Sequence, residues 1–322
     1  MPEKEPMPLV TVITVTYNSA IYVKDAIDSI LHSSYTHFEL IVGDDCSSDD
    51  TWRIVQSYTD IRIRSYRNEV NLGEYPNRNK AIEMAKGEYL LFIDGDDMIY
   101  PHGLEFMVRM LDAFPDCAMA LMTWFRSKLF YPIRITPEQF YLSEYFNNGF
   151  LGTAFSNVLF RTQVLRHEEF LSLRYRSGDN FIRYKIAAKN NSLLINDDLT
   201  WWRETPGQAS QTISKDRSFL LESYQMKFEF LNVKECPLGE KELSLARHNL
   251  YLTLSRQIIS YILKGKVGYA YLLRQRLKIP FKYLFKFYEK QVVVDVFKDY
   301  SATNPCRLAF DRNPYSSFFI NK

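Results

Sequence analysis

Short apolar runs alternate with amphipathic stretches over about the first 120 residues, and this alternation constrains the fold most. The apolar runs are rich in Val, Ile and Leu, as in LVTVITVT at 9–16, which favours buried strands of a parallel sheet. The stretches between them carry apolar residues at helical spacing, as at Val23, Ile27 and Ile30. The expected strands are 9–16, 38–43, 61–66, 88–93 and 118–122.

Strands that alternate with helices of about ten to fourteen residues indicate βαβ units. We therefore expect an α/β fold with a mostly parallel, Rossmann-like sheet and helices on both of its faces. Ser47 is a candidate helix cap and Pro76 a candidate first helical residue. The expected helices are 20–33, 47–58, 76–86 and one that follows Pro101.

The alternation ends after residue 123. A strand at 157–161 and a helix at 180–189 are expected next. Beyond about 213 the pattern is helical, over 216–233, 239–264 and 267–289, with a break expected at Pro280. We therefore expect two domains, a sheet domain over 1–212 and a helical C-terminal region over 213–322.

Composition excludes several classes of protein. The 40 basic and 38 acidic residues give a net charge of +2, too little to hold nucleic acid by a whole-protein field. The four cysteines are scattered, with no zinc or redox pattern, as in a reduced, cytoplasmic protein. The start of the chain does not resemble a signal peptide, and no apolar stretch approaches the roughly 18–20 residues of a membrane span.

Polar clusters follow the expected strands, at the sheet edge where α/β proteins bind ligands. Five acids there would repel one another, and a divalent metal would offset them. Asp94-x-Asp96 is the only Asp-x-Asp in the chain, and Mg or Mn commonly binds through one or two carboxylates plus substrate phosphates. The alternative is a solvated turn. The five acids are Asp44, Asp45, Asp94, Asp96 and Asp97.

Common phosphate-binding and hydrolytic motifs are missing from the sequence. There is no GxxxxGK[ST], no GxGxxG after the first strand, no GxSxG and no HExxH. A P-loop enzyme, a dinucleotide-dependent enzyme with the usual fingerprint, an α/β-hydrolase and a zinc protease are therefore disfavoured.

Four segments together resemble family 2 glycosyltransferases of the GT-A fold. They are VITVTYN, ELIVGDDCSSDDT, NLGEYPNRNKAI and AKGEYLLFIDGDD, in this order and spacing and followed by Pro101. The resemblance is strong over 9–115, weaker over 153–211 and absent beyond about 212. It implies an enzyme that uses a nucleotide-sugar donor and a divalent metal, Mn or Mg. The expected donor is a UDP-linked sugar.

The resemblance also implies roles for individual residues. Tyr17 would stack on the nucleotide base, and Asp45 would hydrogen-bond to that base. Asp94 would lie at the ribose, and Asp96 would ligate the metal that bridges the diphosphate, with Asp97 in support. These roles fit a reaction whose leaving group is a nucleoside diphosphate, because a metal neutralises the charge that develops there.

Two arginines complete the expected donor site. Arg78, in the Arg-Asn step of the third segment, would contact the acidic cluster or the phosphates. Arg203 would reach the diphosphate, with an ordinary surface arginine as the alternative. The family often has Tyr-Arg-x-His here, whereas this chain has Trp202-Arg203-Glu204-Thr205, and a threonine cannot replace a histidine that contacts metal or phosphate.

The expected catalytic base is Asp179. Inverting transfer is a single displacement, so one carboxylate suffices on the acceptor side. The family often places an acidic pair at the start of a helix, but here the first acid of the pair is replaced by Gly178. The alternative role for Asp179 is a helix N-cap.

The segment 264–290 mixes eight Lys or Arg and a single acid, Glu289, with many aromatic residues. Such a segment can bind an anionic membrane surface. The alternatives are a packed helical cap with solvated lysines and, less favoured, a site for single-stranded nucleic acid.

Three functions follow from these patterns. The leading one is an inverting glycosyltransferase, cytoplasmic or peripheral at the inner membrane face, that acts on a saccharide or lipid-linked saccharide in cell-surface polysaccharide synthesis. The second is an inactive relative that serves as a binding or scaffold subunit, motivated by Gly178 and Thr205. The third, a nucleotidyltransferase, would want a basic, Gly-rich loop after the first strand, which is missing. The C-terminal region would serve the acceptor, a membrane or a homo-oligomer.

Overall fold

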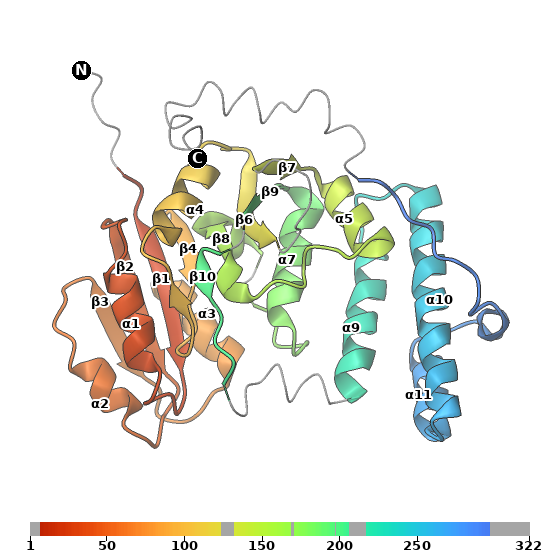
Figure 1. Cartoon of the computed structure of the whole chain (residues 1–322), viewed down its shortest axis with the longest axis horizontal. Coiled ribbons are helices and arrows are strands. Elements are labelled where there is room, and N and C mark those ends of the chain that lie inside the picture. The colour runs from red at the N-terminus through yellow and green to blue at the C-terminus, as the bar shows by residue number, and fades with distance from the viewer. Residues whose placement is uncertain (1–6, 124–131, 169–170, 197, 206–216, 297–322) are drawn as a thin grey trace.

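A computed structural model describes residues 7–123, 132–168, 171–196, 198–205 and 217–296 (Figure 1). The described residues form an eight-stranded sheet of order β3-β2-β1-β4-β8-β6-β9-β7 and a small antiparallel pair, β5 with β10. The strands are β1 (Val10–Thr16), β2 (Phe38–Asp44), β3 (Ile63–Arg67), β4 (Tyr89–Phe92), β5 (Met98–Ile99), β6 (Cys117–Thr123), β7 (Ile133–Ile135), β8 (Val158–Arg161), β9 (Asn191–Asn196) and β10 (Thr200–Trp201).

The first four long strands pair in parallel, as the sequence predicted. β1 lies between β2 and β4, with Val10 opposite Phe38 and Tyr89. β8 runs antiparallel to both β4 and β6, and β7 runs antiparallel to β9. The change of direction at β8 accounts for the loss of the simple alternation in the sequence after residue 123.

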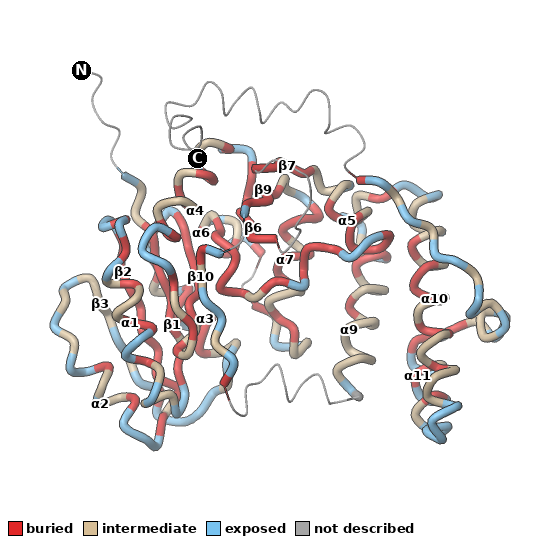
Figure 2. Tube along the Cα trace, in the orientation of Figure 1, coloured by how far each residue is buried: buried red, intermediate tan, exposed pale blue. Residues whose placement is uncertain are grey.

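Helices cover both faces of the sheet, which confirms the expected architecture. Alternate residues of β1 enter two separate cores, since Val10 and Val12 pack with one cluster and Ile13 with the other. Figure 2 shows these buried strands between less buried helices. One face carries α1 (Val23–Leu31), α2 (Thr51–Gln56) and α4 (Gly103–Asp112), and the other carries α3 (Glu74–Met84), α5 (Pro137–Phe146), α6 (Thr162–His167) and α7 (Gly178–Lys189).

A C-terminal helical region is present, as expected, and comprises α9 (Arg217–Phe230), α10 (Glu240–Leu263) and α11 (Val267–Arg276). These helices stand at the opposite end of the molecule from β3 (Figure 1). Side chains of α9 and α10 belong to the same buried cluster as α5 and α7, whereas α11 packs on α10 in a smaller cluster. The proposed boundary at 212 lies outside the described residues. Within the described part of the chain, no helix combines the length and apolarity needed to cross a bilayer.

Some expected helix limits were wrong. The second helix begins at Thr51 rather than Ser47, because the Ser47 hydroxyl donates to the carboxylate of Asp44 instead of capping the helix. The third begins at Glu74, two residues before Pro76. In the tail, α11 ends at Arg276, and up to residue 296, where the described part of the chain ends, only a 3₁₀ turn, η2 (Phe281–Phe285), follows Pro280. A second 3₁₀ turn, η1 (Phe155–Asn157), precedes β8.

Candidate active site

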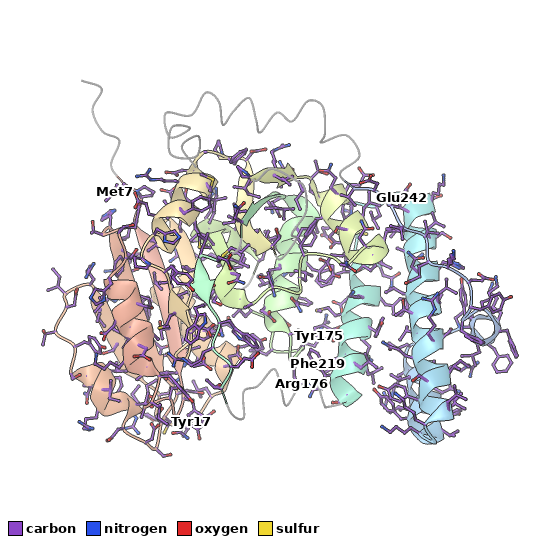
Figure 3. The ribbon with its side chains drawn as sticks, in the orientation of Figure 1. Met7, Tyr17, Tyr175, Arg176, Phe219 and Glu242 are labelled. Atoms are coloured by element: carbon purple, nitrogen blue, oxygen red, sulfur yellow. The ribbon has the colours of Figure 1, made fainter. Side chains whose placement is uncertain are left out.

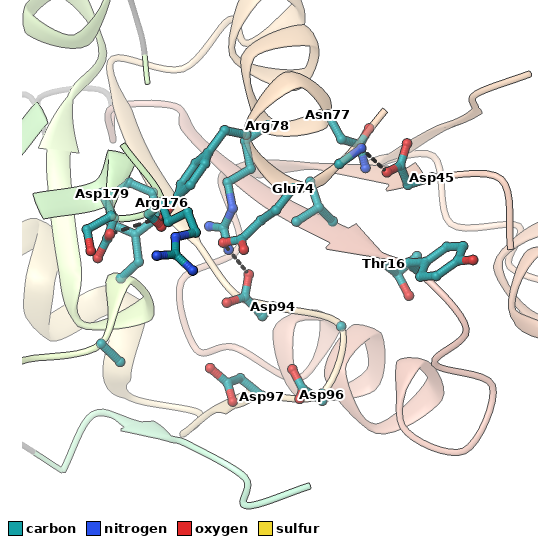
Figure 4. Close-up of a pocket in the computed structure, with 18 of the residues that line it drawn as sticks. Thr16, Asp45, Glu74, Asn77, Arg78, Asp94, Asp96, Asp97, Arg176 and Asp179 are labelled. Carbon is teal, nitrogen blue, oxygen red and sulfur yellow. Dashed lines mark hydrogen bonds and ion pairs between the residues drawn. The ribbon is translucent and has the colours of Figure 1, made fainter. Parts of the chain in front are cut away.

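A cavity of about 840 Å³, here called the sheet-edge pocket, opens at the carboxyl ends of β1, β2 and β4. Open α/β sheets bind their ligands at this position. The structure gathers seven of the eight expected site residues along its walls (Figure 4), whereas Arg203 does not line it. The seven are Tyr17, Asp45, Arg78, Asp94, Asp96, Asp97 and Asp179.

Asp45 holds one wall of the pocket in place. Its carboxylate accepts hydrogen bonds from the Asn68 side chain at 2.8 Å and from the backbone N–H groups of Leu72 at 2.9 Å and Gly73 at 2.8 Å. Gly73 precedes α3 and has a φ of 90°, which residues with a Cβ rarely adopt. Asp45 therefore fixes the turn into α3. Tyr17, in contrast, is 50% exposed at the pocket, so its ring is accessible to a planar ligand.

Arg78 is a buried cation in the wall of the pocket. Its Nη2 donates to Glu74 at 2.9 Å and to Asp94 at 2.6 Å. Its guanidinium lies 5.2 Å from the ring centre of Phe92 and 5.1 Å from that of Phe155. Burial alone would lower the pKa of the Arg78 guanidinium, but the charges of Asp94 and Glu74 outweigh burial and raise it. The expected contact between Arg78 and the acidic cluster is thus present.

The acidic turn after β4 concentrates negative charge. Burial, and then repulsion from Asp94, raises the pKa of Asp96 and raises that of Asp97 to about 7. Asp97 is only 2% exposed, and its two oxygens accept from the backbone N–H of Arg203 and from the Ser156 hydroxyl, both at 3.1 Å. Asp97 is therefore an anchor for two neighbouring segments, and its part in a metal site stays a prediction.

Asp96 is the residue expected to ligate the metal. Its carboxylate is partly buried and meets a single side-chain donor within the described residues, the Thr205 hydroxyl at 3.1 Å. In that same part of the chain, no three His, Cys, Asp or Glu side chains form a metal cluster by themselves. A cation at Asp96 would thus need other oxygen ligands, which substrate phosphates commonly supply to Mg and Mn.

Arg203 lies behind the acidic turn rather than in the pocket. Its Nε donates to the backbone carbonyl of Asp96 at 3.0 Å, and its Nη2 pairs with Asp25 at 2.9 Å. The guanidinium lies 5.0 Å from the ring centre of Tyr22 and 4.9 Å from that of Trp201. These contacts give Arg203 a role in fixing the turn that bears Asp96, and direct contact with a diphosphate stays a prediction.

Asp179 lies in the first turn of α7, and Ser177 rather than Asp179 is the N-cap residue. Its carboxylate pairs with Arg183 at 2.6 Å and accepts from the Tyr75 hydroxyl at 3.2 Å. Arg183 is fully buried and also donates to the carbonyl of Thr153 at 3.0 Å. The Asp179 carboxylate is therefore held at the pocket wall in one orientation.

Steric crowding explains why Gly178 stands where the family often has an acid. A Cβ at Gly178 would lie 2.7 Å from the carbonyl oxygen of Ser172 and 3.2 Å from the ring of Tyr75. Tyr75 occupies this space and contacts Asp179 instead. An acidic side chain at position 178 does not fit this arrangement.

Sequence reasoning missed several pocket residues, among them Glu74, Tyr75, Arg176 and Phe219. Glu74 lies within the third motif and lines the pocket beside Arg78, with which it pairs at 2.9 Å. Tyr75 and Arg176 adjoin recognised residues in the sequence, so proximity was the available signal. Phe219 comes from α9. Only tertiary packing brings it to the pocket, so no local pattern could have identified it.

One further wall, the loop at 149–154, depends on a buried carboxylate. Glu144, near the end of α5, accepts through one oxygen from the backbone N–H groups of Phe150 and Leu151. Gly149 has a φ of 70°, and a Cβ there would collide with the Glu144 carboxylate. Leu151 and its three successors line the pocket.

The family model of glycosyl transferase family 2 matches residues 11–183, which is more than half of the chain. The chain belongs to glycosyl transferase family 2. The match ends within α7, shortly after Asp179, so it includes the sheet-edge acids and the expected base.

Similar curated proteins carry glycosyltransferase names. A Bacillus subtilis (strain 168) protein, named as a teichuronic acid biosynthesis glycosyltransferase, TuaG, is 42% identical over 121 residues, which are 36% of this chain and 48% of that protein. The Escherichia coli UDP-Glc:alpha-D-GlcNAc-diphosphoundecaprenol beta-1,3-glucosyltransferase WfaP is 38% identical over 91 residues, which are 28% of this chain and 36% of that protein. This chain thus spans about half, or less, of the length of these relatives.

Solved structures confirm the GT-A fold. Staphylococcus aureus TarS 1-349 in complex with UDP-GlcNAc superposes with a TM-score of 0.61 at 19% identity, over 89% of this chain and 95% of that one. The mannosyltransferase PcManGT from Pyrobaculum calidifontis, in complex with GDP-Man and Mn²⁺, superposes with a TM-score of 0.58 at 19% identity, over 88% and 84% of the two chains. At this level of identity the likeness concerns the fold alone.

The buried Glu144 gives a pH-dependent prediction for this family 2 chain. Burial raises its pKa above the usual 4.5, so the folded state binds more protons than the unfolded state and stability is lost as the pH rises above 4.5. Glu144→Gln keeps an oxygen acceptor for the loop and removes the charge. We expect its free energy of unfolding to fall less between pH 5 and pH 8 than that of the parent in denaturant titrations.

Glu138→Gln, an exposed change on the same helix, is the control and should match the parent. Parallel pH profiles for the Glu144 variant and the parent would refute the assignment.

The geometry of Asp96 gives a metal prediction. Asp96→Ala should abolish Mn²⁺-dependent binding of UDP in calorimetric titrations while leaving the melting temperature close to that of the parent, because its carboxylate holds no core segment. Asp116→Ala removes an exposed carboxylate outside the pocket and should bind as the parent does. Equal UDP affinity in the Asp96 variant and the parent, with and without a chelator, would contradict the role of Asp96.

Proposed function

We propose that this chain is an inverting glycosyltransferase. It would transfer a sugar from a nucleoside diphosphate sugar, UDP-linked in the first instance, to a hydroxyl of a saccharide or lipid-linked saccharide in cell-surface polysaccharide synthesis. The observation that carries the proposal is that one pocket is lined both by Asp179, the expected base, and by Asp96, the expected metal ligand. Figure 4 draws Asp179 and Asp96 apart, with the pair of Arg78 and Asp94 between them. The names of relatives such as TuaG and WfaP support this class of product.

The donor end of the pocket is proposed around Asp45, Tyr17 and Asp94, with the base against Tyr17 and Asp45 and the ribose at Asp94. A divalent Mn or Mg ion held by Asp96, with Asp97 in support, would neutralise charge on the diphosphate as it leaves. Asp96 fits such an ion, because burial and a neighbouring negative charge make its ionised form costly without one.

The acceptor end is proposed at Asp179. The acceptor hydroxyl oxygen would attack the anomeric carbon, its proton would pass to the Asp179 carboxylate, and the bond from the sugar to the diphosphate oxygen would break. Arg183 holds one carboxylate oxygen, while the other meets only a longer contact with Tyr75 among the described side chains. That second oxygen is the proposed proton acceptor.

The competing proposal is an inactive scaffold of the same fold. It was motivated by Gly178 and Thr205, and both positions have local explanations in the structure. Tyr75 occupies the space at Gly178, and Thr205 donates to Asp96. A scaffold would bind nucleotide sugar without turnover, so activity measurements decide between the two.

The role of Asp179 can be tested with Asp179→Asn. We expect transfer to fall by roughly 10²–10⁴-fold, the usual contribution of general base catalysis. UDP binding should stay near the parent value, because the donor contacts lie elsewhere in the pocket. Some loss of melting temperature is expected, because the buried Arg183 loses its counter-charge.

Glu168→Gln is the matched control, since Glu168 also pairs with cations of α7 but lies outside the pocket. It should transfer sugar at the parent rate. Near-parent transfer by the Asp179 variant would place the base elsewhere, and a parent protein that binds donor without any transfer or hydrolysis would favour the scaffold.

We also propose peripheral attachment to an anionic membrane through a C-terminal basic surface. Many apolar side chains of this surface are exposed among lysines, and Leu263, at the end of α10, is 82% exposed. Figure 3 shows Glu242 near the top of α10 and the pocket residues Tyr17 and Phe219 low in the view, so α10 ends on the side of the pocket. A lipid-linked acceptor could then reach the pocket. The exposed apolar residues are Leu263, Val267, Tyr271, Leu272, Phe281, Phe285, Phe287 and Tyr288.

Vesicle co-sedimentation tests this attachment. The parent should bind vesicles that contain anionic lipid and bind them less at high salt, because the cations contribute about 1 kcal/mol each near the surface. Leu263→Asp with Phe285→Asp should weaken binding without altering UDP affinity. Ile61→Asp changes a 97% exposed apolar residue just before β3, at the other end of the molecule, and should bind as the parent does. No binding by the parent at low salt would exclude the membrane proposal.

A further inference from the structure

A second cavity, of about 510 Å³, lies between the C-terminal helices and the segment that leads into α7. Arg174 and Tyr175 form its wall on the catalytic side. The outward face of α9 contributes residues such as Glu222 and Glu229, and the end of α11 contributes Arg276 and Lys278. None of the expected site residues lines this cavity, here called the helical cavity.

The helical cavity adjoins the sheet-edge pocket. Arg176 lines the sheet-edge pocket, Glu222 lines the helical cavity, and the two side chains pair at 3.0 Å. Figure 3 shows Tyr175, Arg176 and Phe219 gathered at this junction, with α9 rising beside them. Tyr175 is four residues from Asp179, so their Cα atoms are at most about 14 Å apart. A short oligosaccharide with one end at Asp179 could therefore extend into the helical cavity.

The charges of the helical cavity are not balanced. Its two acids are already paired, Glu222 with Arg176, and Glu229 with Arg174 and with the Tyr175 hydroxyl. In contrast, no ion pair or side-chain hydrogen bond involves Arg276 or Lys278 among the residues that the structure describes. Two cations therefore face a cavity whose own carboxylates are neutralised, which is the setting that favours a bound anion.

The backbone at Lys278 supplies a second observation. Lys278 follows Leu277, the C-cap residue of α11, and has a φ of 50°. Glycine is the usual residue at this position of a helix end, because a Cβ is unfavourable there. A lysine in this conformation carries a backbone cost that its side chain does not recover through an ion pair or a hydrogen bond within the described residues. A ligand that binds the ammonium group would account for it.

We propose that the helical cavity is an acceptor subsite for anionic saccharides, with Arg276 and Lys278 binding phosphate or carboxylate groups of a chain whose terminal hydroxyl lies at Asp179. This inference rests on the proposed glycosyltransferase function. Phe228 also lines the cavity and supplies an apolar side chain against which a sugar ring can pack. Phosphodiester-linked and uronic acid chains share the required chemistry.

The test compares binding of three probes of matched length at low salt by calorimetry: a glycerol phosphate oligomer, an oligogalacturonate and a neutral malto-oligosaccharide. The parent should bind one or both anionic probes more tightly than the neutral one. Arg276→Ala with Lys278→Gly should weaken anionic binding at least about tenfold, as expected for two lost charge-assisted contacts. Because glycine suits the backbone at 278, this double variant should keep its melting temperature.

Lys264→Ala with Lys266→Ala is the matched control, since it removes two exposed cations from the start of the α10–α11 turn, outside the cavity. It should bind the probes as the parent does. Donor hydrolysis should be unchanged in both variants. If the parent has no donor turnover, the proposed function fails, but the binding comparison still decides on the subsite.

Two results would contradict the proposal of an acceptor subsite in the helical cavity. One is equal affinity of the parent and the Arg276 and Lys278 double variant for the anionic probes. The other is loss of anionic vesicle binding by that variant with unchanged oligosaccharide binding, which would assign both cations to the membrane surface instead.

Discussion

The interaction between Arg78 and the acids around it underlies the whole pocket. Asp94 ends β4, Glu74 begins α3, and a single guanidinium nitrogen of Arg78 bonds both. The rings of Phe92 and Phe155 enclose the same cation, so the charge lies between the sheet and the loop that precedes β8. Among the described residues that line the pocket, Arg78 is the one buried cation beside the acidic turn. Without it, the charge of Asp94 would lose this partner. The sheet, α3 and the loop before β8 therefore depend on one another through this side chain.

A comparable arrangement exists around Asp179, the proposed acceptor end of the pocket. Arg183 is fully buried, pairs with Asp179 and donates to the carbonyl of Thr153 in the loop at 149–154. Glu144 holds that loop from its other side. Asp94 and Asp179 are thus each paired with a buried arginine. Removal of one partner of such a pair is strongly destabilising, because it leaves an uncompensated buried charge.

The sequence predicted the sheet well, because each strand is marked by its own apolar run and this pattern is strong. Parallel strands buried on both faces read as continuous apolar runs, and polar residues at their ends mark one edge. Seven of eight expected site residues consequently meet in one pocket. Arg203 is the exception: its position depends on the pairing of β10 with β5, a contact between segments about 100 residues apart that no local pattern announces.

Helix limits and the proposed acceptor side were harder to predict for a related reason. Ser47 has the residue type of a cap, yet it bonds Asp44, and the choice between these partners depends on the fold around β2. Phe219 and Glu222 reach the two cavities because α9 packs against α5 and α7. The spacing of apolar residues identifies a helix but does not say which distant loop it will contact. That the sheet-edge pocket adjoins the helical cavity was therefore visible only in the structure.

The close fit of Tyr75 against Gly178 also has an evolutionary consequence. A substitution that restored an acid at 178 would place its Cβ 2.7 Å from the Ser172 carbonyl oxygen and in tight contact with the Tyr75 ring, whereas a smaller residue at 75 would leave a gap and deprive Asp179 of a hydrogen bond. The two positions are therefore coupled, and their effects on stability should not add. A lineage that has acquired this tyrosine–glycine pair is separated from the more common acidic pair by a disfavoured intermediate, whichever position changes first.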